Sequence, residues 1–444
     1  MSNNDIKIIA INLPQFHPFA ENDEWWGKGF TEWTNVTKSL PRFKGHYQPQ
    51  LPTDLGFYDL RLEESRIAQA ELAKAHGIDG FCYYHYWFNG KRLMNRPLDD
   101  MLKTQTPDFP FMFCWANENW TRRWDGQEQE VLIKQDYSFE DDREHIRFLI
   151  KTFFADPRYI KVNGKPFFCV YRPNLFPDIA KTIAIWKEEA KIAGLPGLYL
   201  GYFQSFGVKT EYCEKGFDTS VQFPPQSFEY TPLRVNNETG KLSFCSENYN
   251  TNLPKDGENI VFDYSELVYN SSQNSEASEK QILGVTPSWD NSARRKNNPF
   301  VLVNSTPDLF GKWLNNMLFK TVNSNTEHKF LFINAMNEWA EGNHLEPCIK
   351  WGKAYLEIIQ SIKSKNLIEF DKELLVDFSK VSNVGYFIKY LEKNRSLVKI
   401  NEVLKKYEIE RDLKVKFYLC YFYFIFHPFR KTYFLFLALL NKFK

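Results

Sequence analysis

Eight short apolar runs recur along this chain, and segments with helical periodicity lie between most of them. The runs that we predict to be strands cover residues 6–12, 78–84, 109–115, 166–171, 198–203, 218–223, 282–287 and 330–335. Helical periodicity covers residues 62–75, 138–153, 177–193, 260–280, 306–322 and 351–363. Strands that alternate with helices form parallel sheets, and eight such units fit a barrel better than an open sheet. The sequence therefore predicts an α/β chain folded as a (β/α)8 TIM-type barrel.

The composition divides the chain into this barrel and two C-terminal segments. We assign residues 1–365 to the barrel, with residues 224–258, rich in Pro, Asn, Ser and Gly, as a long loop over one face. Residues 366–412 are predicted to form a helical extension. The apolar runs in the tail, residues 413–444, are shorter than the roughly 20 residues of a transmembrane helix. Their aromatic and basic residues are typical of a segment in the membrane interface, although a tail that packs on the barrel or forms an oligomer contact is the alternative.

Charge and aromatic content narrow the class of partner. A net charge of +1 gives no global reason to expect binding to nucleic acid. Aromatic residues make up 17% of the chain, and tryptophans beside polar residues suit a site that stacks flat rings, either sugars or nucleobases. The chain has no G-x-G-x-x-G after a strand, no P-loop lysine motif and no D-x-D, which argues against an ordinary nucleotide-sugar transferase.

Cysteine usage and the N-terminus predict where the protein resides. The seven cysteines include no C-x-x-C pair, and residues 1–5 lack the basic and apolar regions of a signal peptide. We therefore expect a cytoplasmic protein, peripheral on the inner face of the membrane if the tail binds lipid. The eight histidines show no ligand spacing, so no metal and no cofactor is expected.

Two carboxylates follow the last predicted strand. Glu338 and Glu341 are three positions apart, with Trp339 between them. Cleavage of a glycosidic bond uses one carboxyl to protonate the leaving oxygen and a second carboxylate at the same sugar. Two solvated charges in a loop are the alternative interpretation. We predict that Glu338 and Glu341 are catalytic.

Amides, carboxylates and aromatic residues follow most of the predicted strands, at the end of the barrel where active sites lie. The predicted substrate-binding residues are Gln15, His17, Glu32, Trp33, Tyr84, His85, Tyr86, Trp87, Trp115, Asn117, Glu118, Trp120, Tyr171, Trp289, Asp290, Asn337 and Trp339. Such side chains bind hydroxyl groups and stack on sugar rings. His17 and His85 could equally be buried histidines bonded to carbonyl groups. Glu118, which follows Asn117 after a strand, is a rival candidate for the general acid.

Six sequence blocks occur together in a known family. They are LPQFHP at 13–18, WWGKGFTEWTNV at 25–36, YHYWF at 84–88, WANENWT at 115–121, TPSWDN at 286–291 and NEWAEG at 337–342. Across residues 6–360 the chain resembles the WbsX family. Those proteins occur in bacterial O-antigen and capsule clusters, are named glycosyltransferases, and are related to glycoside hydrolase family 99.

The resemblance implies a (β/α)8 barrel and a mechanism. In the related hydrolases, which cleave α-mannosidic linkages with retention, the first Glu of Glu-Trp-x-Glu deprotonates the 2-hydroxyl of the sugar and gives a 1,2-anhydro intermediate. The second Glu is the acid for the leaving group and then the base for the acceptor. These roles fall on Glu338 and Glu341. Ala340 stands where the hydrolases often carry His, so their detailed substrate contacts do not carry over.

Three functions are compatible with these observations. The first is WbsX-like glycosyl transfer in the biosynthesis of lipopolysaccharide O-antigen or capsule, with an oligosaccharide or lipid-linked glycan as partner. The second is an endo-acting retaining glycoside hydrolase that resembles an α-mannosidase. The third is a barrel that binds polysaccharide without turnover.

Overall fold

The structure is a computed structural model that describes residues 6–122, 127–208, 211–228, 232–244, 258–273, 278–326 and 328–364. The predicted helical extension, residues 366–412, and the predicted tail, residues 413–444, lie outside the described residues. In the described part, no helix combines the length and the apolar character that crossing a bilayer requires.

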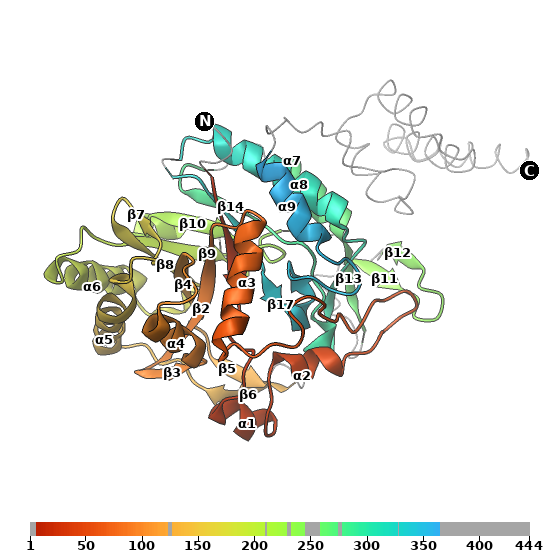
Figure 1. Cartoon of the computed structure of the whole chain (residues 1–444), viewed down its shortest axis with the longest axis horizontal. Helices are drawn as coiled ribbons and strands as arrows, with labels where there is room; N and C mark the ends of the chain where they lie inside the picture. Colours follow the sequence, from red (N-terminus) through yellow and green to blue (C-terminus); the bar gives the residue numbers. More distant parts are fainter. Residues whose placement is uncertain are drawn as a thin grey trace, which may run out of the picture.

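Eight parallel strands close into a barrel (Figure 1). They are β1 (Lys7–Asn12), β2 (Gly80–Phe88), β4 (Phe111–Trp115), β8 (Lys165–Val170), β9 (Tyr199–Gln204), β10 (Thr219–Gln222), β14 (Gln281–Val285) and β16 (Phe330–Ile333). Neighbouring strands follow the order β1-β16-β14-β10-β9-β8-β4-β2, and the pairing of β1 with β2 completes the circle. All eight runs predicted from the sequence form these strands, which confirms the (β/α)8 barrel.

Several barrel strands are buried on both faces, which explains their continuous apolar runs. Residues 8–12 of β1 and all residues of β4 and β16 are buried. Strands of a parallel sheet lie between helices on one face and the barrel interior on the other, so both faces exclude water.

Helices surround the barrel (Figure 1). The longer ones are α3 (Glu63–Ala75), α4 (Arg96–Thr104), α5 (Phe139–Leu149), α6 (Ile179–Ile192), α7 (Tyr264–Gln273), α8 (Pro307–Asn323) and α9 (Ala354–Lys363). A π-helical turn, η3 (Ile150–Phe154), continues α5. Ser138, Asp178 and Thr306 cap α5, α6 and α8, because each side chain accepts a hydrogen bond from a backbone N–H in the first turn.

Short elements decorate the connections. Two short helices, α1 (Ala20–Trp26) and α2 (Glu32–Thr37), lie between β1 and α3. The short strands are β3 (Lys91–Leu93), the hairpin β5 (Trp120–Arg122) and β6 (Gln127–Ile133), and β7 (Lys161–Val162). Single 3-10 turns are η4 (Pro173–Leu175), η5 (Glu211–Lys215) and η6 (Asn291–Ala293).

A second sheet, which the sequence analysis did not predict, lies beside the barrel. Its order is β12 (Leu242–Phe244), β11 (Leu233–Val235), β13 (Ile260–Asp263) and β15 (Phe300–Val303). Part of the predicted loop 224–258 therefore forms strands, and the predicted helix 260–280 begins with β13. In Figure 1 this sheet is on the opposite side of the molecule from α5 and α6. Phe43, Leu233, Val261 and Val301 form its small core.

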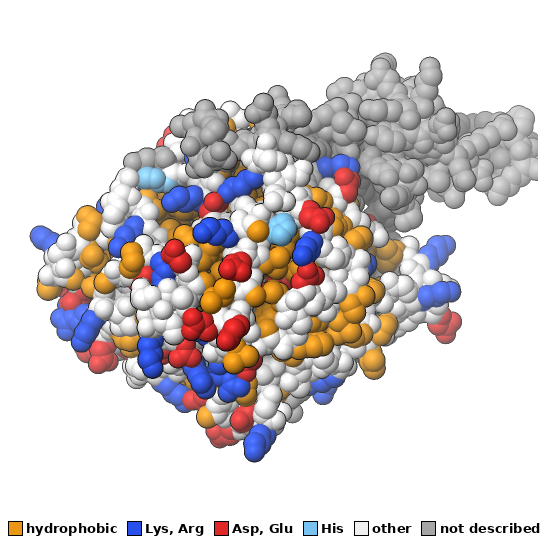
Figure 2. Space-filling model, viewed as in Figure 1, with side chains coloured by type: hydrophobic (Ala, Val, Ile, Leu, Met, Phe, Trp, Pro, Cys, Tyr) orange, Lys and Arg blue, Asp and Glu red, His pale blue; other side chains and the backbone are white. Residues whose placement is uncertain are grey.

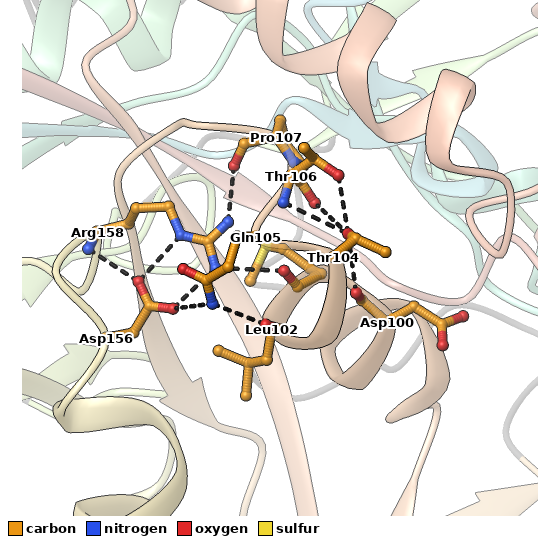
Figure 3. A network of polar contacts seen from close by, with 9 residues as sticks. Asp100, Leu102, Thr104, Gln105, Thr106, Pro107, Asp156 and Arg158 are labelled. Atoms are coloured by element: carbon orange, nitrogen blue, oxygen red, sulfur yellow. Dashed lines mark hydrogen bonds and ion pairs between the residues drawn. The ribbon is translucent and has the colours of Figure 1, made fainter.

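A buried ion pair fixes the connection into β4 at the N-terminal end of the barrel (Figure 3). Arg158 donates from Nε to Asp156 Oδ1 at 2.9 Å and from Nη2 to Asp156 Oδ2 at 2.8 Å. Its Nη1 donates to the Pro107 carbonyl at 2.9 Å, on the segment that precedes β4. Burial alone would raise the pKa of Asp156, but the hydrogen bonds from Arg158 outweigh it and leave that pKa below its ordinary value.

The surface carries mixed charge. Figure 2 shows Lys and Arg interspersed with Asp and Glu over the face in view, with hydrophobic side chains between them. Among the described residues of this face the charges form no extended stripe of one sign, in keeping with the small net charge.

Candidate active site

A cavity of about 180 Å³ opens at the C-terminal ends of the barrel strands. Its lining consists of Leu13, Gln15, Tyr84, Tyr86, Ala116, Glu118, Asn119, Trp120, Thr121, Tyr171, Phe223, Gln226, Trp289, Arg294, Glu338 and Glu341. Aromatic rings, amides and carboxylates thus face one space, although they come from segments far apart in the sequence.

The two glutamates predicted to be catalytic lie on a compact turn after β16. Glu338 ends β17 (Asn337–Glu338), Glu341 ends the 3-10 turn η7 (Trp339–Glu341), and β18 (Asn343–His344) pairs back onto β17. This turn packs against the segment after β14, where the Asp290 N–H donates to the Glu341 carbonyl at 2.6 Å. The local structure therefore aims both carboxylates at the same cavity.

Gly342 makes the turn possible. Its φ is +57°, a left-handed conformation that residues with a Cβ adopt only at a cost. A Cβ at this position would lie 2.7 Å from Gln50 Nε2 and 2.9 Å from Asp290 Cβ. The close packing of the turn therefore requires a glycine here.

Arg294 connects three carboxylates at the base of the cavity. Its Nε donates to Glu32 Oε1 at 3.1 Å, and its Nη2 donates to Glu338 Oε2 at 2.8 Å. The distance from Nη1 to Glu341 Oε1 is also 2.8 Å. One buried guanidinium therefore holds both predicted catalytic groups, and Glu32 supports it from α2.

Burial and neighbouring charges shift the pKa values of Glu338 and Glu341. The pKa of Glu338 is raised to about 8, because burial, together with the charge of the neighbouring Glu341, outweighs the opposing effect of Arg294. Burial also raises the pKa of Glu341, again against Arg294. Two carboxyls that interact this closely titrate as a pair. Raised pKa values bring such a pair closer to the pH range in which one member can act as an acid and the other as a base.

Strand alternation divides the aromatic cluster of β2 between two environments. Tyr84 and Tyr86 line the cavity. Side chains of successive strand residues point to opposite faces, so His85 and Trp87 face away from it. His85 Nε2 lies 3.0 Å from His145 Nε2, and Trp87 Nε1 donates to Asp141 Oδ1 at 2.9 Å, both on α5. Burial lowers the pKa of His85 well below its ordinary value.

The cluster after β4 divides in the same way. Glu118 and Trp120 line the cavity, with Glu118 Oε2 at 3.4 Å from Arg172 Nη1. Trp115 is fully buried beneath them and donates from Nε1 to the Trp87 carbonyl. The Asn117 side chain accepts hydrogen bonds from the backbone N–H groups of Tyr171 and Arg172, and so ties this loop to the end of β8.

Several of the predicted substrate-binding residues do not line the cavity but form hydrogen bonds behind its lining. His17 is buried with Nδ1 donating to the Pro14 carbonyl, and burial lowers its pKa to about 4. Asp290 accepts hydrogen bonds from His46 and Gln48. The other predicted substrate-binding residues in this position are Glu32, Trp33, Asn337 and Trp339. Glu32 lies on α2, and Trp33 Nε1 donates to the Tyr58 carbonyl. The Asn337 side chain accepts from the Leu13 N–H, and Trp339 Nε1 donates to Glu346.

The structure adds lining residues that the sequence analysis missed. Phe223 and Gln226 follow β10, and Asn119 and Thr121 flank Trp120. Arg294 follows η6, and the signal for it was weak, because residues 294–296 read as an ordinary basic surface run. Within the described residues, no cluster of three or more His, Cys, Asp or Glu side chains is placed to hold a metal ion.

Comparison with known proteins agrees with this architecture. The model of a family described as glycosyltransferase WbsX matches residues 8–359. Proteins named WxcX from two strains of Xanthomonas campestris pv. campestris are 39% identical over 351 residues, which is 79% of this chain and 48% of each relative. The chain thus spans about half the length of these curated relatives.

Solved structures align with this chain over most of its length. A glycoside hydrolase-like protein aligns with a TM-score of 0.52 at 14% identity, over 82% of this chain and 95% of its own. The GH99 endo-alpha-mannosidase from Bacteroides thetaiotaomicron aligns with a TM-score of 0.47 at 15% identity, over 82% and 97% of the two chains. Since the family model covers most of the sequence, the chain belongs to the WbsX glycosyltransferase family.

Proposed function

We propose that this protein transfers a glycosyl group during assembly of a bacterial surface polysaccharide such as O-antigen or capsule. The observation that carries the proposal is the pair Glu338 and Glu341, held by one guanidinium at a cavity lined with aromatic and amide side chains. Membership of a family described as glycosyltransferases favours transfer over hydrolysis.

The proposed reaction has two balanced steps. Glu338 takes the proton of the 2-hydroxyl of the donor sugar, O2 attacks C1, and Glu341 protonates the departing glycosidic oxygen. The 1,2-anhydro sugar that results keeps its place in the cavity. Glu341 then takes the proton of an acceptor hydroxyl, whose oxygen attacks C1, and O2 departs and regains its proton from Glu338. Two displacements at C1 give net retention.

Tyr84, Tyr86 and Trp120 support this reaction as the aromatic walls that would receive sugar rings. Burial raises the pKa of Tyr84 and of Tyr86, so both phenols stay neutral and can donate hydrogen bonds to hydroxyl groups. Partial exclusion of water strengthens the electrostatic contacts inside such a site.

Hydrolysis is the second candidate function. The same pair could activate water in place of a sugar hydroxyl, and the fold is shared with a glycoside hydrolase-like protein. We therefore propose to incubate the purified protein with polyprenyl-linked oligosaccharide and labelled sugar nucleotides. Extension of the lipid-linked glycan supports transfer, whereas release of reducing ends without extension supports an endo-acting retaining hydrolase.

Glu338→Gln and Glu341→Gln variants complete this experiment. Both are expected to lose either activity. If these variants bind glycan as the wild type does, and the wild type itself shows neither extension nor hydrolysis, the protein is a polysaccharide-binding barrel and the proposal is overturned.

A further inference from the structure

A second and larger cavity, of about 370 Å³, adjoins the catalytic one. One of its walls is β15 with the residues after it, to Thr306, and the segment 43–47 and the turn before β12 form a second wall. The second sheet (β12-β11-β13-β15), called the accessory sheet below, therefore forms this cavity together with the turn that carries Glu341, because Gly342 also lines the cavity. Trp289 lines both cavities and forms part of the partition between them.

The second cavity carries positive charge. Lys44 and Lys350 both line it. The Lys350 ammonium lies 5.0 Å from the centre of the Tyr47 ring and 4.9 Å from that of Trp351, and within the described residues it forms no ion pair with a carboxylate. Asp290, the acidic residue of this lining, is already bonded to His46 at 2.7 Å and to Gln48 at 2.6 Å.

The catalytic cavity has the opposite character. Glu118, Glu338 and Glu341 line it, and Arg294 is the cation among its lining residues in the described part of the chain. A phosphate or carboxylate group placed there would be repelled by these carboxylates, whereas the two lysines of the second cavity would attract it.

Trp289, in the partition, carries a polar group whose hydrogen-bonding capacity is unused in the part of the chain that the structure describes. Trp289 is 4% exposed, and within the described residues its Nε1–H has no hydrogen-bond acceptor. A buried indole N–H without an acceptor is unfavourable, so an acceptor on a bound ligand would stabilise it. Tyr47, which is 37% exposed, and Trp351 add rings on which a sugar could stack.

We propose that this second cavity binds an anionic sugar unit of the substrate, with Lys44 and Lys350 holding its phosphate or carboxylate, while the reacting sugar occupies the catalytic cavity. The inference rests on the proposed function in taking the ligand to be part of the glycan substrate. Phosphate and carboxylate share the same charge-assisted hydrogen bonds to lysine, and the experiment separates the two sources.

The test is calorimetric titration of the full chain with glucose 1-phosphate, glucuronic acid and methyl glucoside. At least one of the two anions is expected to bind about tenfold more tightly than the neutral glucoside, with an affinity that falls as salt is added. Lys350→Met is expected to weaken that binding about tenfold, whereas Lys350→Arg, which keeps the positive charge, is expected to retain most of the wild-type affinity. Lys181→Met is the matched control, because Lys181 also lies over a ring, that of Phe139 at 3.9 Å, but on α6 away from both cavities.

Each outcome decides the inference. Binding of glucose 1-phosphate alone identifies a phosphate as the anion, and binding of glucuronic acid alone identifies an acidic sugar. Equal affinity for the three probes, or an unchanged affinity in Lys350→Met, overturns the inference. Glu341→Gln is expected to keep the anion site. A wild type that binds the anion but shows no turnover would therefore overturn the proposed function and leave the second site intact.

Discussion

At the scale of single residues, Arg294 and the carboxylates around it determine the charge of the proposed catalytic cavity. The guanidinium contacts Glu32, Glu338 and Glu341 at once, and these carboxylates raise its own pKa despite its burial. Since a nearby cation favours the ionised form of a carboxyl, Arg294 opposes the effect of burial on both predicted catalytic groups.

Replacement of Arg294 should therefore change the pH dependence of the reaction. In Arg294→Met the pKa values of Glu338 and Glu341 rise further, because burial remains and the cation is lost. The base must be deprotonated to act, so the low-pH limb of kcat/KM is expected to move to higher pH. The measurement is kcat/KM against pH, with Arg294→Lys as the control that keeps the charge. An unchanged limb in Arg294→Met would contradict this account.

Glu118 and Glu341 give a second contrast between residues. Glu341→Gln is expected to reduce the rate at least about a hundredfold, the effect of losing a general acid or base. Glu118 has 30% of its side chain exposed and is paired with Arg172, which suits a contact to hydroxyl groups rather than proton transfer. Glu118→Gln is expected to raise KM more than it lowers kcat. If Glu118→Gln lost its activity while Glu341→Gln kept it, Glu118 rather than Glu341 would be the general acid.

The turn β17–η7–β18 is the element that presents Glu338 and Glu341, the proposed catalytic pair. Its geometry depends on contacts to the segment after β14, where Ser288 Oγ donates to the Gly342 carbonyl and Thr286 Oγ1 donates to Asn343 Oδ1 at 2.9 Å. A change within this element should move Glu341 without removing any group of the site.

Gly342→Ala tests that dependence. A residue with a Cβ in this left-handed conformation lowers the free energy of unfolding by roughly 1–2 kcal/mol. The close contacts of that Cβ with Asp290 and Gln50 destabilise the fold further. Gly56→Ala is the matched control, because Gly56 has a similar φ of +60° but a Cβ added there would have no neighbouring atom within 4 Å. Thermal unfolding and kcat/KM are the measurements. We expect both variants to lose some stability and Gly342→Ala alone to lose most of its activity; equal activity losses would contradict the expectation.

The whole molecule divides stability and function between the two ends of the barrel. Asp156 and Arg158 are at the N-terminal end, where their ion pair is buried, and the proposed catalytic cavity is at the C-terminal ends of the strands. Residues at the N-terminal end of such a barrel serve stability rather than catalysis.

Arg158→Met should accordingly destabilise the fold and leave the chemistry intact. Loss of one partner of a buried pair typically costs about 3–5 kcal/mol, because the other charge stays buried and unpaired. Lys312→Met, which breaks the exposed pair with Asp308, is the control and should cost at most about 1 kcal/mol. Chemical denaturation and the activity of the folded fraction are the measurements. A pH profile of activity that changed in Arg158→Met would contradict the separation.

The ion pair between Asp156 and Arg158 should also make the stability of the fold depend on pH in acid. The pKa of Asp156 is lower in the folded state, so its contribution to stability is present above its unfolded pKa and is lost as pH falls through the folded pKa. In Asp156→Asn, stability should vary less with pH over this acidic window than in the wild type. A parallel decline of the two proteins in acid would contradict the assignment.

The sequence by itself determined the barrel, because most strands that are buried on both faces form continuous apolar runs. The sixth strand, β10, has the sequence TSVQ and gave the weakest signal of the eight. The sequence also predicted which loops carry polar and aromatic residues, including the segment with Glu338 and Glu341. It did not separate Tyr84 and Tyr86, which line the cavity, from His85 and Trp87, because the face that each strand position takes depends on the packing of β2 against α5.

Only the tertiary structure decided which distant groups meet. Arg294 lies 262 positions from Glu32 in the sequence, yet the two side chains are in contact. The accessory sheet likewise joins β13 to β15 and brings residues 43–47 beside β15, which creates the second cavity. Contacts of this kind leave no periodic signal in the chain, because they depend on how the loops of a closed barrel converge, and their electrostatic consequences follow from burial that only the folded state provides.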